Sequence, residues 1–134
     1  PLTYVFSFSL VNETRNPPPR VSFRKITREV MGNAYALTVI FTTPKKIQTL
    51  NAAYRKKHSS TDILSFALSK SEGELYISMP DVAKKAPLFY LSTKKYFEYL
   101  FIHGLVHLKG MDHGRTMDAA ERRYCKKFGF SYPN

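Results

Sequence analysis

The chain has 134 residues, of which 43% are hydrophobic, so it is long enough to bury a core as one domain spanning residues 1–134. It contains no apolar run of roughly 18 residues and no leader segment, which argues against a membrane-spanning class and, with a single cysteine, leads us to expect a cytoplasmic protein with no membrane partner. The 21 lysines and arginines outnumber the ten aspartates and glutamates and give a net charge of +11, which favours nucleic acid as a partner.

Strands and helices alternate in the first half of the chain. The segments 2–11 and 35–42 are rich in β-branched and aromatic residues, so each predicts a strand. The second is almost continuously apolar and therefore belongs inside a sheet. A helix between them follows the break "NPPPR" and ends before Gly32, since glycine commonly follows a helix C-terminus. Its apolar face comprises Ile26, Val30 and Met31.

A second helix is predicted over residues 44–55. Thr43 is a suitable N-cap, and Pro44 fits the first helical position, where its missing N–H would have no partner in any case. A polar loop over residues 56–61 follows. The expected buried face of the helix comprises Ile47, Leu50 and Tyr54.

The second half of the chain predicts a β-hairpin and then two helices. Ser92 or Thr93 can cap the first of these helices. The order of elements predicts an α+β fold, in which a mixed four-stranded sheet packs with four to five helices. The predicted elements are strands at 62–69 and 75–79 around a glycine-containing turn at 71–74, and helices at 93–109 and 116–128.

Three of the four histidines lie in one short segment, "HGLVHLKGMDH". In the predicted helix, His103 and His107 are four residues apart and share one face. The turn that Gly110 permits can bring His113 back toward them. Three neutral imidazoles and a water form the open site of a hydrolytic zinc centre. The spacing therefore predicts one zinc ion, or another divalent transition metal, at the C-terminal helix pair.

Two residues within this segment qualify that interpretation. Asp112 is either an acceptor that orients a ligand imidazole or a simple turn residue. Gly104 stands where the metzincin zinc proteases, which share the histidine spacing, carry their catalytic glutamate. The missing general base argues against a peptidase. Histidines packed in a core are the alternative to a metal site, but three at this spacing favour the metal.

The segment "HGLVHLKGMDHG" (103–114) resembles the signature of the YbeY-type ribosomal RNA maturation factors, which are metal-dependent single-strand endoribonucleases. The segment "LNAAYRKKHSSTDILSF" (50–66) is similar to the family's pattern of Leu-Asn, Arg and Thr-Asp-x-Leu-Ser-Phe. The segment "GELYISMPDVAKKA" (73–86) resembles the family's strand with Ile-Ser, which runs into a loop and helix. The chain departs from the family at Met111, often Tyr, and at Ala67, where the family has Pro.

The resemblance implies that His103, His107 and His113 bind one metal ion and that Arg55 faces it across a cleft. It also implies a role in maturation of the small-subunit ribosomal RNA 3′ end and in ribosome quality control. The partners would be single-stranded ribosomal RNA and the ribosome or small-subunit components. The planar fork of Arg55 suits a phosphate, although an arginine at a helix C-terminus also simply favours the helix dipole.

The remaining expectations concern RNA contacts and the general base. Tyr54, Phe66 and Tyr76 can stack on bases, although core packing is the stronger expectation. Metal-bound hydroxide, Asp112 and the 2′-hydroxyl of the RNA all qualify as the base. A ribosome-associated RNA-binding assembly factor with a structural metal, or a metal-dependent hydrolase of another substrate, are the alternative functions. The basic residues expected to bind the RNA backbone are Lys56, Lys57, Lys84 and Lys85.

Overall fold

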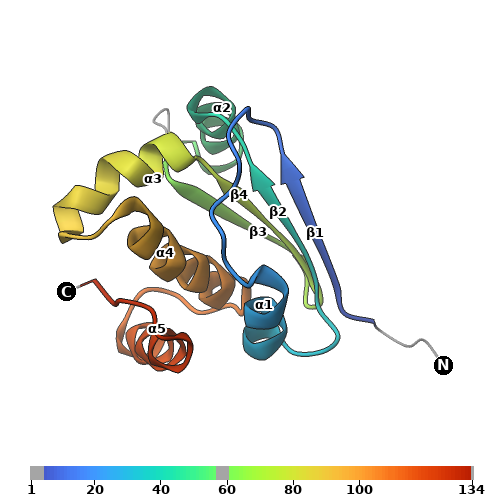
Figure 1. Cartoon of the computed structure of the whole chain (residues 1–134). Helices are drawn as coiled ribbons and strands as arrows, with labels where there is room; N and C mark the ends of the chain where they lie inside the picture. Colours follow the sequence, from blue (N-terminus) through green and yellow to red (C-terminus); the bar gives the residue numbers. More distant parts are fainter. Residues whose placement is uncertain (1–4, 57–60, 134) are drawn as a thin grey trace.

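One four-stranded sheet, with helices packed on one face, organises the chain (Figure 1). The structure, a computed structural model, describes residues 5–56 and 61–133. Within these residues, five α-helices and one mixed sheet confirm the predicted α+β class. The elements are β1 (Ser7–Asn12), α1 (Phe23–Met31), β2 (Ala36–Phe41), α2 (Pro44–Arg55), β3 (Ile63–Ser69), β4 (Glu72–Ile77), α3 (Met79–Lys85), a short 3-10 helix (Ala86–Phe89), α4 (Thr93–Leu108) and α5 (Arg115–Phe128).

The strands of the sheet follow the order β1-β2-β4-β3. β1 and β4 both run parallel to β2, whereas β3 pairs antiparallel with β4. β2 therefore lies inside the sheet, as its apolar sequence predicts, and the predicted hairpin is confirmed. β1 begins later than the predicted strand over 2–11, because its pairing with β2 starts at Ser7, opposite Ala36. Residues 2–4 lie outside the described part of the chain.

The hydrophobic core lies between the sheet and a layer formed by α1 and α4, and α5 packs on the outer side of α4 (Figure 1). On β2, the alternate residues Leu37, Val39 and Phe41 are buried on the helix side. Phe23 of α1 meets Phe101 of α4 edge to face, with ring centroids 5.2 Å apart. α4 contacts α1, α5 and β3. This central position of α4 fixes the helix that carries two of the three clustered histidines.

The turn between β3 and β4 is tighter than the predicted turn at 71–74. Residues 70 and 71 form it, and Gly73 belongs to β4, because parallel pairing with β2 extends that strand to Glu72. Gly73 is buried under α4, and a Cβ on it would lie 2.3 Å from Tyr35 Oη and 2.9 Å from Leu108 Cδ2. Close packing, and not turn geometry, requires a glycine here.

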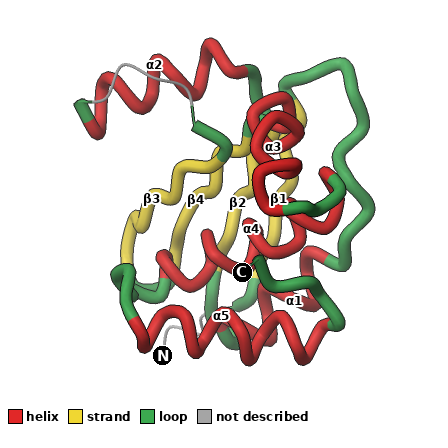
Figure 2. Tube along the Cα trace, turned by 90° about the vertical axis from the view of Figure 1, so that its left-hand side faces the viewer, coloured by secondary structure: helices red, strands yellow, loops and turns green. Residues whose placement is uncertain are grey.

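α2 has the predicted limits and N-cap, but its buried face differs from the prediction. Thr43 Oγ1 accepts a hydrogen bond from the Lys46 N–H at 3.2 Å. Ile47 is fully buried, whereas Tyr54 is 70% exposed. Asn51 is buried instead. The reason is that α2 lies across one end of the sheet and not on its face (Figure 2). Neighbouring elements therefore cover less of its last turn.

The end of α1 and both limits of α4 and α5 agree with the predicted limits to within a residue. In α1, Ile26 and Val30 are buried, and Gly32 follows with a φ of +92°. Ser92 caps α4, since its Oγ accepts from the Lys95 N–H at 3.2 Å. The short α3 has no apolar periodicity long enough to predict a helix, and only the family resemblance implied one there. Among the described residues, no helix is both long and apolar enough to cross a membrane.

Candidate active site

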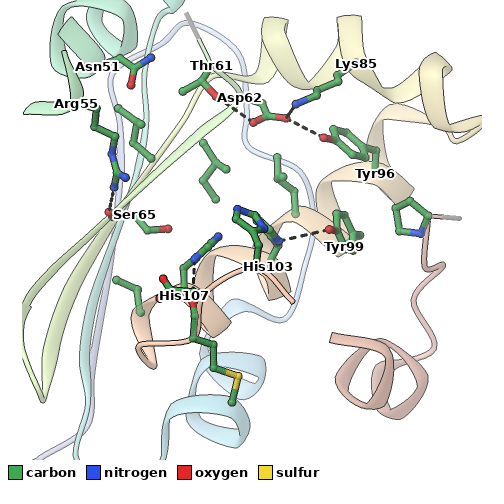
Figure 3. Close-up of a pocket in the computed structure, with 18 of the residues that line it drawn as sticks. Asn51, Arg55, Thr61, Asp62, Ser65, Lys85, Tyr96, Tyr99, His103 and His107 are labelled. Carbon is green, nitrogen blue, oxygen red and sulfur yellow. Dashed lines mark hydrogen bonds and ion pairs between the residues drawn. The ribbon is translucent and has the colours of Figure 1, made fainter. Parts of the chain in front are cut away.

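His103 and His107 project from the same face of α4 (Figure 3). The helix ends at Leu108, and Gly110, with a φ of +89°, turns the chain so that His113 returns toward the pair. The ring centroids of His103 and His107 lie 4.6 Å apart, and that of His113 lies 5.6 and 4.9 Å from them. One nitrogen from each ring lies within 4.8 Å of the other two. The three imidazoles thus converge, as their spacing predicts.

Two of these imidazoles are oriented through their Nδ1 atoms. Glu121 of α5, only 2% exposed, places Oε2 2.5 Å from His103 Nδ1. The Met111 carbonyl oxygen lies 3.1 Å from His107 Nδ1 and accepts a hydrogen bond from its N–H. Tyr99 adds a longer contact to His103 Nδ1 at 3.4 Å (Figure 3). With Nδ1 engaged in both rings, Nε2 remains as the nitrogen available to a metal.

The donor set suits a divalent transition metal. A metal binds the neutral form of imidazole, and burial, followed by the nearby His103 and His113, lowers the pKa of His107. Three nitrogen ligands supported by a buried carboxylate and a backbone carbonyl match zinc better than the oxygen-seeking Mg²⁺ or Ca²⁺. The cluster is therefore compatible with a metal site, and metal binding itself stays a prediction.

The packing around Gly104 explains why no glutamate follows the first histidine of this helix. The residue faces the sheet, and a Cβ on it would lie 2.8 Å from Ile63 Cδ1 and 3.0 Å from Leu75 Cδ2. A glutamate at this position would enter the core and not the cavity beside the histidines. The site geometry therefore agrees with the expectation that the chain is not a metzincin protease.

Arg55 lies in the wall of the same cavity as the three histidines. The cavity measures about 840 Å³ and is lined by residues of α2, β3 and α4 together with the segment after α4. Arg55 is exposed, and its Nη2 donates a hydrogen bond to the Ser65 carbonyl oxygen at 2.6 Å. The Ser65 hydroxyl in turn contacts the Gly104 carbonyl oxygen of α4 at 3.4 Å. β3 thus connects the arginine to the histidine helix.

The buried acidic residue Asp62 forms another part of the cavity wall. Asp62 is 5% exposed, accepts a hydrogen bond from Tyr96 Oη at 2.8 Å and lies 3.7 Å from Lys85 Nζ (Figure 3). Burial, together with the charge of Asp62, raises the pKa of Tyr96, so the phenol stays protonated as a donor. Lys85 is half exposed and also lines the cavity. Asp62 therefore holds a positive charge at the cavity wall.

The other lysines expected at the RNA interface fall in different places. Lys56 is exposed directly after Arg55 and adopts a left-handed conformation with a φ of +56°. Lys84 is exposed on α3 but does not line the cavity. Lys57 lies outside the described residues. Lys85 is thus the lysine that the structure brings into the same cavity as Arg55.

Asp112 is exposed and lines the cavity. Among the described residues, the groups that contact the ring nitrogens of His103 and His107 are Glu121, Tyr99 and the Met111 carbonyl, and not Asp112. A catalytic role for Asp112 therefore stays a prediction.

Sequence reasoning missed Glu121, Asp62 and Tyr96. A signal for Glu121 existed, because on α5 it falls between the buried Met117 and Cys125 at four-residue intervals, and a carboxylate on an apolar helix face needs a partner. Asp62 offers no comparable signal of burial, since it stands where the polar loop over 56–61 meets the predicted strand over 62–69, although it belongs to the family's Thr-Asp-x-Leu-Ser-Phe pattern. Its partner Tyr96 lies 34 residues away in the chain, so only the fold brings the two together.

Comparison with known proteins identifies relatives over most of the chain. The family model described as Endoribonuclease YbeY matches residues 5–129. The endoribonuclease YbeY of Petrotoga mobilis is 34% identical over 107 residues, which cover 78% of this chain and 74% of that protein. Its counterpart in Coxiella burnetii is 34% identical over 113 residues, with coverage of 75% and 74%. That of the Aster yellows witches'-broom phytoplasma is 38% identical over 107 residues, with coverage of 69% and 73%.

A solved structure shows the same fold. The solution structure of a protein from Thermotoga maritima aligns with a TM-score of 0.63 at 23% identity and covers 90% of this chain and 88% of its own. The matched residues 5–129 span Arg55 and all three clustered histidines. By the extent of that match and the identity to its relatives, this chain belongs to the YbeY endoribonuclease family.

Proposed function

We propose that this chain is a zinc-dependent endoribonuclease that cuts single-stranded ribosomal RNA. One observation carries the proposal: Arg55 and the histidines at 103, 107 and 113 line a single cavity of about 840 Å³. A phosphodiester between them would meet a guanidinium on one side and the histidine cluster on the other. The family match supports RNA as the substrate, and the net charge of +11 suits a polyanion.

The chemistry of each group suits this reaction. The three imidazoles would hold one zinc ion or another divalent transition metal, which supplies a Lewis acid for a phosphoryl oxygen and for water when bound. Arg55 binds a phosphate oxygen through its planar fork and stabilises the negative charge that builds on it during cleavage. Lys85 attracts the phosphate backbone from the other wall. Glu121 and the Met111 carbonyl hold two imidazoles in the orientation that exposes Nε2.

The proton acceptor and the biological role belong to the same proposal. Asp112 lines the cavity and is our candidate to accept a proton, with the 2′-hydroxyl of the RNA as the alternative. Lys56, Lys57 and Lys84 would follow the backbone outside the cavity. Residues 1–134 would act as one cytoplasmic domain in maturation of the small-subunit ribosomal RNA 3′ end and in ribosome quality control. Its partners there would be the ribosome or small-subunit components.

Replacing Arg55 by alanine tests this proposal. Loss of one positioned donor to developing charge commonly costs about a hundredfold in turnover. We therefore expect Arg55→Ala to cut a single-stranded RNA about a hundredfold more slowly, with zinc content and circular dichroism unchanged. Turnover is measured with a fluorophore-labelled RNA under saturating protein.

A control substitution separates a site effect from loss of general positive charge. Arg123 is exposed on α5 and does not line the cavity, so Arg123→Ala removes the same charge elsewhere. Its turnover should stay within about twofold of the unsubstituted protein. Equal turnover in Arg55→Ala and Arg123→Ala would reduce Arg55 to a helix-end cation and remove the main support for the proposed nuclease site.

A further inference from the structure

An exposed aromatic side chain lies directly beside the candidate active site. Tyr54 precedes Arg55 in the last turn of α2, and it is 70% exposed although the helical pattern predicts burial. Its ring contacts Phe66 of β3 with centroids 5.6 Å apart and an interplanar angle of 73°. Because the contact is edge to face and most of Tyr54 is exposed, the phenol ring keeps surface open to solvent.

The side chain on which Tyr54 packs, Phe66, is itself held by its neighbours. Phe66 packs edge to face on Tyr76 of β4, with centroids 5.7 Å apart. The guanidinium carbon of Arg55 lies 5.5 Å from the Phe66 ring centroid. Such aromatic and cation–π contacts restrict side-chain rotation. Tyr54 therefore presents a positioned aromatic surface, in contrast to Tyr90, which is 96% exposed.

The strand β3 contributes both to the cavity and to this aromatic surface. β3 is the last strand in the sheet order, and its successive side chains point to opposite faces. Ser65 lines the cavity and contacts α4, whereas Phe66 points to the other face. Arg55 reaches the Ser65 carbonyl, and Tyr54 reaches Phe66. The last turn of α2 thus spans the edge of the sheet.

The charges around the ring indicate where a polyanion can lie. Arg55, which lines the cavity, and the exposed Lys56 follow Tyr54 directly in the chain, and their positive charges favour phosphates. Farther across the outer face, Glu74 lies opposite Phe66 in the strand register. Burial, followed by the charges of Glu74 and Glu13, raises the pKa of Tyr76. The carboxylate of Glu74 therefore disfavours phosphates on this outer face, whereas Arg55 and Lys56 favour them next to Tyr54.

We infer that Tyr54 is a base-stacking residue for the RNA strand next to the phosphate bound by Arg55. This inference deepens the proposed function and rests on single-stranded RNA as the ligand. A nucleobase has a flat, uncharged face, which suits an open phenol ring, and stacking on aromatic side chains is a general way to bind single strands without reading their sequence. Tyr54 then positions one nucleotide on one side of the cut.

The test is a binding experiment that does not depend on cleavage. The probe is a fluorescein-labelled, 2′-O-methylated single strand of about 12 nucleotides, a length within the usual range for single-strand sites. Its dissociation constant is measured by fluorescence anisotropy with the metal-loaded protein. Tyr54→Ala should bind about tenfold more weakly, and Tyr54→Trp should bind at least as tightly as the unsubstituted protein. Tyr90→Ala, which removes an exposed tyrosine elsewhere, should change the constant by less than about twofold.

A second arm identifies the stacked base. An abasic nucleotide is moved through the probe one position at a time. In the unsubstituted protein one position should weaken binding about tenfold, and in Tyr54→Ala the same position should have no effect, because the two changes remove the same contact. Equal losses in both proteins at every position, or an equal effect of Tyr90→Ala, would overturn the inference, as would a failure of the unsubstituted protein to bind the probe. A protein that shows this coupling but does not cleave RNA would contradict the proposed function and leave the stacking role supported.

Discussion

At the scale of single residues, His103 shows how far a metal site depends on groups outside its motif. The four-residue spacing places the ring on α4, but Glu121, 18 residues later on α5, sets its orientation. A buried carboxylate needs a charge-assisted partner, and the imidazole N–H provides one. The pair therefore stabilises the packing of α5 on α4 and, at the same time, directs Nε2 toward the other histidines.

Removing the charge of Glu121 should weaken metal binding. In Glu121→Gln a neutral amide replaces the carboxylate that accepts from the His103 N–H. The imidazole of His103 is then a less basic and less firmly oriented ligand. Loss of such a supporting group typically lowers metal affinity about 10- to 100-fold. We expect a zinc affinity lower by that factor, measured by competition with a chromophoric chelator.

An exposed carboxylate on the same helix serves as the control for this change. Asp118 lies in the first turn of α5 and is exposed. Asp118→Asn should bind zinc as tightly as the unsubstituted protein. If Glu121→Gln and Asp118→Asn have equal affinities, the His103 contact with Glu121 serves packing alone.

At the scale of elements, helix limits follow from local chemistry, and strand limits follow from partners. Thr43 and Ser92 each accept a hydrogen bond from the first turn of their own helix, so the start of α2 and of α4 can be predicted from neighbours in sequence. The extension of β4 to Glu72 depends on pairing with Ala36 of β2. No local pattern contains that pairing, so the local sequence predicts a turn at Gly73 where the structure has a strand.

Gly73→Ala should destabilise the contact between β4 and α4. The new Cβ would lie 2.3 Å from Tyr35 Oη, so the phenol or the backbone must shift, and such overpacking costs about 1–3 kcal/mol in free energy of unfolding. Urea denaturation followed by circular dichroism measures the change.

A double substitution isolates the cause of that loss. Tyr35 Oη is buried and has no hydrogen-bond partner among the described residues, so Tyr35→Phe alone should be neutral or slightly stabilising. Gly73→Ala should cost less in the Tyr35→Phe background than in the unsubstituted protein. Equal costs in the two backgrounds would show that the hydroxyl is not the group in the way.

At the scale of the whole molecule, α4 is anchored by the core independently of the histidines. Phe97, Phe101 and Leu105 on its opposite side are fully buried, while His103 and His107 are only partly buried. Burial of apolar side chains is the main source of folding stability. The fold around the cavity should therefore persist without a metal. This is the behaviour expected of an open catalytic site, whereas removal of a structural metal unfolds the surrounding chain.

Removing the metal should thus abolish cleavage and leave the fold intact. After chelation, we expect an unchanged far-ultraviolet circular dichroism spectrum and complete loss of RNA cleavage. RNA binding should survive, because lysines and arginines carry it, and should fall steeply with salt. Adding back one equivalent of zinc should restore cleavage. Melting of α4 and α5 on chelation would instead favour an RNA-binding factor with a structural metal.

Local sequence patterns are enough to predict four of the five α-helices, the α+β class and the convergence of the three histidines. Each depends on residues close together in the chain: caps at Thr43 and Ser92, the interval between His103 and His107, and the turn at Gly110. Local spacing controls these features because helix geometry is the same in every protein. The family resemblance added Arg55, whose place in the cavity the structure then showed.

Which groups support the site, and which side chains face solvent, depends on how the elements pack. Glu121 against His103, and Asp62 against Tyr96, join residues 18 and 34 positions apart, and such pairs form only when separate elements pack. Tyr54 is exposed because α2 lies across one end of the sheet (Figure 2). Periodicity identifies the apolar face of a helix, but only the packing of neighbouring elements determines how much of that face is covered.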